Sequence, residues 1–222
     1  MERNWPLSAK RVLDPEERIS AVLSGLIMAL TFTCTFSVVD AGRASTHTML
    51  LAALGCNLAW AIIDGAFYLM SCYSKHGHNI ILMRQVQQGS ETDGRGIISG
   101  ALPPLLVPLL PEGTLESMRQ KVAAMPPVPK DPRLKREDWI GAAGVALLIF
   151  LSTFPVAIPF LFFSAPSEFK HALRISNAIA IVMMFLAGHY FGVHASGHPW
   201  RAGIWAVLLG GLMVGVAIAL GG

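Results

Sequence analysis

The stretch GCNLAWAIIDGAFYLM, residues 55–70, decides what kind of protein this is. Asp64 is its only charged residue, and the stretch belongs to a longer, mainly apolar run over residues 49–72. About 20 such residues cross the ~30 Å hydrocarbon core of a bilayer. The run therefore predicts a membrane-spanning helix with a carboxyl group near its middle.

The composition of the whole chain agrees with a membrane location. Of its 222 residues, 53% are hydrophobic and only 14% are charged, whereas soluble domains carry about 25% charged residues. A soluble enzyme with a solvated shell and a disordered chain are both excluded. The three Cys have no paired spacing, so neither a disulfide framework nor a CxxC metal motif is expected.

Five stretches are long and apolar enough to span a membrane: residues 19–39, 49–72, 139–163, 173–193 and 202–220. We therefore predict an all-α integral membrane protein with five transmembrane helices and a short cytoplasmic insertion between the second and third. The parts are an N-terminal segment (1–18), helices 1 and 2 (19–72), a Pro/Gly-rich insertion (73–138) and helices 3 to 5 (139–222).

Local signals add detail to this plan. Asp14 followed by Pro15 predicts a helix start, and residues 73–90 are expected to continue the second helix. Residues 91–111 are rich in Gly and Pro, residues 112–124 predict a short helix, and residues 125–132 predict a polyproline-like linker. Pro155 and Pro159 predict a kink in the third span.

The orientation follows from the Lys and Arg residues. Fourteen of the 17 lie in the N-terminal segment, the insertion and the turn before the fifth span, and three lie on the other side. The positive-inside rule then places the N-terminus and residues 73–138 in the cytoplasm and the C-terminus outside. We expect the inner membrane of a bacterium, with the lipid bilayer as partner and no nucleic-acid partner.

Asp64 is the leading functional candidate, because a carboxylate at mid-membrane costs roughly 2.5–3.5 kcal/mol on insertion scales. Asn57, Trp60 and Tyr68 lie one or two helical turns from it on the same helical face. This face is typical of a cation or proton site. The alternative is a protonated Asp64 that hydrogen-bonds a neighbouring helix and fixes packing.

A second face lies on the first span and carries Ser24, Met28, Thr31 and Thr35. Hydroxyls and a thioether can line a path for a soft divalent ion, so Asp64 and Met28 are the candidate metal ligands within the membrane. Ordinary packing by small polar residues is the alternative. Gly188-x-x-x-Gly192 and Gly211-x-x-x-Gly215 predict close helix approach within or between subunits.

The cytoplasmic side offers a second candidate set, through which metal would reach the membrane path. It comprises Cys72, His76, His78, Glu112, Glu116 and Met118. Imidazole and thiolate suit transition metals, but the short spacings equally fit solvated side chains at the interface. His189, His194 and His198 at the end of the fourth span have the same two interpretations.

Catalytic motifs are missing from the sequence, which contains no GxSxG, HExxH, Walker or GxGxxG pattern. Intramembrane aspartyl chemistry would need two paired acids, and Asp64 is the only acid well inside a predicted span. We therefore expect no enzyme and no resident cofactor.

Several segments resemble the vacuolar iron transporter family. They are LLIFLSTFPVAIPFLFF (147–163), LAGHYFG (186–192) and WRAGIWAVLLGGLMVGVAIALGG (200–222), while ERISAVLSGLIMALTFT (17–33) and GCNLAWAIIDGAFYLM (55–70) resemble a small bacterial branch related to it. The family carries an Asp before the Gly-Leu of its first span, where this chain has Ser24. It carries Met-Gly in its second span, where this chain has Ile63-Asp64.

The resemblance implies a homodimer that moves Fe(II) or Mn(II), with proton exchange as an optional coupling and Asp64 as a relocated acid. The first hypothesis is therefore a divalent-metal transporter. The second is a membrane scaffold or assembly protein that kept the fold and lost the metal site.

Overall fold

The computed structural model describes residues 13–39, 46–163 and 168–219, and every regular element among them is helical. Contacts divide the chain into two compact units. The bundle unit comprises the described parts of Met1–Tyr68 and Glu137–Gly222, and the insertion unit comprises Leu69–Arg136. The helix α2 (Thr46–Gln88) supplies residues to both units.

Four helical stretches among the described residues are long and apolar enough to cross a membrane: Leu50–Gln88, Arg136–Phe162, Lys170–His194 and Pro199–Val216. They overlap four of the five predicted spans, which agrees with an all-α membrane protein. The first predicted span corresponds to α1 (Pro15–Val39), a helix of 25 residues. It begins at Pro15 as expected, because proline needs no N–H partner at the first helical position.

Proline divides the third predicted span into two helices. The first, α5 (Arg136–Ser152), ends just before Thr153, and α6 (Phe154–Phe162) follows with Pro155 in its first turn. Proline lacks the N–H that would continue the helical ladder of α5, so the predicted kink is a break at Thr153. Helix α5 begins three residues before the predicted span, so Asp138 lies in its first turn.

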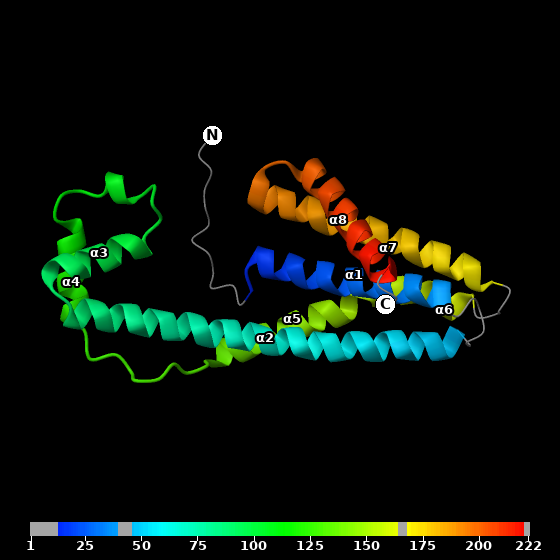
Figure 1. Cartoon of the computed structure of the whole chain (residues 1–222), viewed down its shortest axis with the longest axis horizontal. Helices are drawn as coiled ribbons and strands as arrows, with labels where there is room; N and C mark the ends of the chain where they lie inside the picture. The colour runs from blue at the N-terminus through cyan, green and yellow to red at the C-terminus, as the bar shows by residue number, and fades with distance from the viewer. Residues whose placement is uncertain (1–12, 40–45, 164–167, 220–222) are drawn as a thin grey trace. The chain divides into compact units, whose positions relative to one another are not determined.

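The centre of the bundle unit is α7 (Phe169–Phe191), which packs against α1, α6 and α8 (Pro199–Ala219). Figure 1 shows α7 and α8 side by side, joined through the short turn η2 (Gly192–Ser196). The main apolar core draws on α1, α6, α7 and α8: Leu26, Ala29, Leu30, Val156, Ala180, Met184 and Val214.

Glycines set the close contact between α7 and α8. A β-carbon on Gly188 would lie 2.8 Å from the carbonyl oxygen of Ala202, and one on Gly192 would lie 2.5 Å from the Cα of Pro199. Gly188 and Gly192 therefore allow close packing between two helices of the same chain. Gly211 and Gly215 have no neighbour within 4 Å of such a β-carbon among the described residues.

The insertion unit contains the end of α2, α3 (Glu91–Ala101), η1 (Val107–Leu109) and α4 (Thr114–Ala123). The continuation of α2 and the helix α4 confirm the predictions for residues 73–90 and 112–124. Helix α3 was not expected in a glycine-rich stretch. Ser90 explains it, because its side chain caps the helix by accepting a hydrogen bond from the backbone N–H of Asp93.

Candidate functional site

The carboxylate of Asp64 on α2 meets a hydroxyl of α1. Ser24 Oγ donates to Asp64 Oδ2 at 3.2 Å. Asp64 is half-buried, Ser24 is exposed within the single chain, and Ser24 is the only hydrogen-bond partner of Asp64 among the described residues. No described Lys or Arg forms an ion pair with this carboxylate. Two predicted path residues are therefore in contact, and the acid has no fixed cation beside it.

Helix α5 determines how closely α1 and α2 approach at this pair. Gly25, the residue after Ser24, packs on α5, where a β-carbon would meet Ser152 Oγ and would lie 2.6 Å from the carbonyl oxygen of Ile149. Gly65, the residue after Asp64, also faces α5, where a β-carbon would lie 3.2 Å from the carbonyl oxygen of Ala142. Ser24 and Asp64 are thus each followed by a glycine that lets its helix pack closely against α5.

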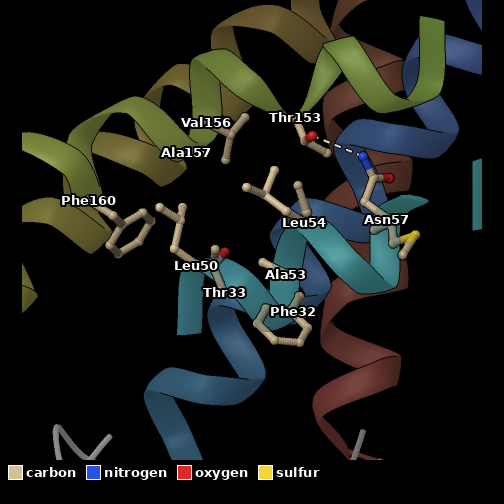
Figure 2. A pocket seen from close by; sticks show the side chains of 12 residues that line it. Phe32, Thr33, Leu50, Ala53, Leu54, Asn57, Thr153, Val156, Ala157 and Phe160 are labelled. Carbon is tan, nitrogen blue, oxygen red and sulfur yellow. Dashed lines mark hydrogen bonds between the residues drawn. The ribbon is translucent and has the colours of Figure 1, made fainter. Parts of the chain in front are cut away.

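Asn57, two turns before Asp64 on α2, is 1% exposed and points at the break between α5 and α6. Its Nδ2 donates to Thr153 Oγ1 at 2.9 Å (Figure 2) and to the carbonyl oxygens of Ile149 and Phe150 at 3.3 and 3.4 Å. These three acceptors fix the orientation of the amide. Asn57 Oδ1 is consequently left buried without a hydrogen-bond partner among the described residues.

The break in the helix makes these acceptors available. The N–H of Thr153 bonds to the carbonyl of Phe150 at 3.3 Å, three residues back, rather than to that of Ile149. The Ile149 carbonyl then accepts from Ser152 Oγ at 2.7 Å and from Asn57. The tightened turn at Thr153, two residues before Pro155, therefore supplies the polar anchor for Asn57.

A narrow pocket begins at Asn57 and continues between α1, α2 and α6 (Figure 2). Its polar lining consists of Asn57, Thr33 and Thr153, with the thioether of Met28, and the rest is apolar. The centre of a water molecule can occupy about 30 Å³ of this pocket, and about 10–15 Å³ is enough to hold one water. The pocket thus has room for a water-sized group beside a buried amide.

Thr33 and Thr153 are site residues that the sequence did not single out. Thr33 Oγ1 is 3.1 Å from the carbonyl oxygen of Leu30 and 3.3 Å from Asn177 Oδ1, to both of which it can donate. Thr153 receives the Asn57 amide. The position of Thr153 two residues before Pro155 is a signal that could have found it, because helix breaks expose carbonyl and hydroxyl groups.

The other predicted path residues lie elsewhere. Thr31 is half-buried and does not line the pocket, and the side chain of Thr35 lies outside the described residues. Tyr68 is half-buried and packs on α5, where a β-carbon on Gly141 would lie 2.5 Å from its hydroxyl oxygen. Trp60 is 49% exposed, so the face predicted for Asp64 is not buried as a whole.

The predicted cytoplasmic metal residues lie in the insertion unit. No group of three or more His, Cys, Asp or Glu that could hold a metal occurs among the residues that the structure describes. Cys72 is buried, and His78, Glu112 and Met118 are exposed. His76 Nδ1 lies 3.1 Å from the backbone carbonyl of Arg133. Metal binding by this set stays a prediction.

Glu116 belongs to an ion-pair network rather than to a cluster of acids. Its carboxylate accepts hydrogen bonds from Arg119 Nη2 at 2.7 Å and from Arg119 Nε at 3.0 and 3.1 Å. These bonds lower the pKa of Glu116 and raise that of Arg119. Arg119 also lies 3.7 Å from Glu91 and packs its side chain on Gly94, so it joins α4 to α3.

The histidines at the end of α7 have separate surroundings. The ring of His189 contacts that of Trp200 edge-on, with centroids 5.7 Å apart. His194 Nδ1 lies 2.9 Å from the carbonyl oxygen of Tyr190. Gly197 has φ of +69° and ends the short turn η2, so His194 and His198 do not face each other along one continuous helix.

Comparison with known proteins adds no relative: no family model matches this chain, and no curated protein matches it.

Proposed function

We propose that this protein transports a divalent transition metal, Fe(II) or Mn(II), across the inner membrane of a bacterium. The observation that carries the proposal is the contact between Ser24 and Asp64. A carboxylate at mid-membrane is costly, and one hydroxyl does not neutralise its charge. It needs a proton or a metal cation, and exchange of one for the other is the step that couples metal movement to protons.

The resemblance to the vacuolar iron transporter family supports the same site. Members of that family carry an acid at the position that corresponds to Ser24, and here Asp64 on α2 lies within hydrogen-bond distance of Ser24. In this proposal, Asp64 takes the place of the acid that α1 lacks. Met28, one turn beyond Ser24, lines the pocket that also contains Asn57, which gives a path with oxygen and thioether ligands.

The proposal includes five spans, with α1 as the first, and a homodimer. The N-terminus and the insertion face the cytoplasm and the C-terminus faces outward. Ser24 is exposed and Asp64 is half-buried in a single chain, so a second copy against α1 and α2 would complete the shielding of this pair. Native mass spectrometry in detergent and in nanodiscs tests the dimer, and a monomer under all conditions would contradict it.

Uptake of Fe(II), Mn(II), Co(II) and Zn(II) into proteoliposomes, measured side by side, tests the function. Asp64→Asn keeps the size of the side chain and removes its titratable charge, and we expect it to abolish metal uptake. Glu168→Gln is the matched control because Glu168 is an exposed carboxylate before α7 with no side-chain cap bond. Asp64→Glu, which keeps the charge, should retain part of the activity.

Circular dichroism and size exclusion show whether each variant folds. Asp64→Asn that folds and transports like the wild type would exclude Asp64 as the site. Wild-type protein that transports none of the four ions would overturn the transporter proposal, and the scaffold or assembly role would take its place.

A further inference from the structure

The insertion unit contains a groove that the transport proposal does not use. One wall is a face of α2 and the other is the linker that follows α4. Its open volume is about 550 Å³. Apolar residues from both walls line it, namely Ile80, Met83, Val128 and Pro129, and the polar lining is His76, Asn79, Asp131, Arg133 and Lys135.

Side chains of α2 hold the linker in place along the groove. Arg84 Nη2 donates to the carbonyl oxygens of Pro129 and Lys130 at 3.0 and 3.4 Å. His76 Nδ1 lies 3.1 Å from the carbonyl oxygen of Arg133. A carbonyl oxygen only accepts, so the His76 proton is on Nδ1 in this contact. The prolines stiffen the linker further, and the groove is therefore preformed before any ligand binds.

The linker is strongly basic where it forms the groove. Residues 130–136 contain Lys130, Arg133, Lys135 and Arg136, with Asp131 as the only acid. Arg133 and Lys135 line the groove directly, and together they outweigh the charge of Asp131. Guanidinium and ammonium groups are the usual protein partners of phosphate. A basic rim beside an apolar wall suits a ligand with an anionic head and a hydrocarbon body.

The position of the groove in the sequence indicates where such a ligand comes from. Lys135 directly precedes the apolar stretch Arg136–Phe162, one of the four that can cross a membrane. Groups of Lys and Arg immediately beside a membrane span attract anionic lipids, and each contributes about 1 kcal/mol near the surface. The basic linker therefore adjoins a membrane-crossing stretch in the sequence, which favours an anionic lipid headgroup as the ligand.

We propose that this groove binds the headgroup of an anionic phospholipid. Arg133 and Lys135 pair with the phosphate, and the glycerol and first acyl carbons lie along Ile80, Met83 and Val128. The site depends on the membrane location of the chain but not on metal transport, so either proposal can fail without the other.

Calorimetric titration of the full-length protein in detergent tests the site. The probes are dioctanoyl phosphatidylglycerol, dioctanoyl phosphatidylcholine and inorganic phosphate. We expect saturable binding of phosphatidylglycerol that weakens as salt is raised, and no saturable binding of phosphatidylcholine. Arg133→Gln with Lys135→Gln should weaken phosphatidylglycerol binding by about tenfold or more, because two charge-assisted contacts are lost.

Lys121→Gln with Arg201→Gln is the matched control, since it removes two exposed bases outside the groove. This control should bind phosphatidylglycerol within about twofold of the wild type, because screened surface charges contribute little. Equal binding of the two lipids, or an equal loss in the two double variants, would overturn the proposal. Inorganic phosphate that binds as tightly as phosphatidylglycerol would replace the lipid with a soluble phosphate ligand and would also overturn it.

Discussion

Ser24 on α1 and Asp64 on α2 are joined by a hydrogen bond of 3.2 Å although 40 residues separate them in the sequence. Each is followed by a glycine that packs against α5, so the contact is built into the packing of three helices. This arrangement places a hydroxyl beside the only acid within the predicted spans.

Removal of the Ser24 hydroxyl should change metal binding at the Asp64 carboxylate without altering the helices. We expect Ser24→Ala to keep the fold and to change the affinity for the transported metal by about tenfold, since hydrogen bonds to charged groups contribute about 1.5–3 kcal/mol. Metal-dependent uptake of Ser24→Ala, of Asp64→Glu, which should retain part of the activity, and of the double variant checks this. If the two residues act together, the effects will be non-additive. Additive losses would mean that the hydroxyl acts independently.

Gly25 should tolerate no side chain. Its β-carbon would collide with Ser152 Oγ and the Ile149 backbone, so we expect Gly25→Ala to destabilise the protein by about 1–3 kcal/mol. Gly55→Ala is the control, because Gly55 lies in α2 with nothing within 4 Å of such a β-carbon among the described residues. Alanine there should be neutral or stabilising by up to about 1 kcal/mol. Unfolding in mixed detergent micelles measures both, and equal stability of the two variants would contradict the close packing.

Asn57 should be a structural anchor as well as a path residue. We expect Asn57→Ala to lower the free energy of unfolding by about 1–3 kcal/mol, because the acceptors at the α5–α6 break lose their buried donor. Leu58→Ala, at the next and exposed position of α2, should cost less. Thermal unfolding in detergent compares the two. A loss at Asn57 no larger than that at Leu58 would show that the amide does not hold α2 to the break.

Helix α4 and its contact with α3 should weaken in acid, because Glu116 bonds to Arg119 within α4 and lies 3.9 Å from Arg95 of α3. Hydrogen bonds from Arg119 lower the pKa of Glu116 from its usual value of about 4.5. The stabilisation is therefore present above that value and is lost as the pH falls through the lowered pKa. Hydrogen exchange of α4 amides should quicken over this acidic range in the wild type. Glu116→Gln should exchange faster at neutral pH and respond less to acid, and an unchanged pH profile would contradict the role of Glu116.

The proposed orientation predicts opposite labelling of two positions. In a cysteine-free background, a cysteine at Ser90 should react with an impermeant thiol reagent only from the cytoplasmic side, because 14 of the 17 basic residues share that side. A cysteine at Gly222 should react from outside. Labelling of intact and opened cells measures this, and reaction of both positions in intact cells would show that the orientation is wrong.

The sequence alone determined the features that depend on local chemistry. Apolar length predicted five spans, four of which overlap helical stretches that can cross a membrane. Pro15 marked the start of α1, and the prolines of the third span predicted a kink where the structure has a break. Helix α3 was missed although its signal is local. The Ser90 cap stabilises α3 although this helix contains three glycines, a residue type with low helix propensity.

Only the tertiary structure decided which polar groups meet. The helical period places Asn57, Trp60 and Asp64 on one side of α2, but it cannot say which neighbour lies against each of them. Asn57 reaches the α5–α6 break, Asp64 reaches Ser24, and Trp60 remains exposed. The Gly211 and Gly215 pair likewise resembles Gly188 and Gly192 in sequence, and yet a β-carbon at either position would have no neighbour within 4 Å among the described residues. A helix carries its own hydrogen-bond pattern, whereas the partner of each face is fixed by packing between segments that are distant in the chain.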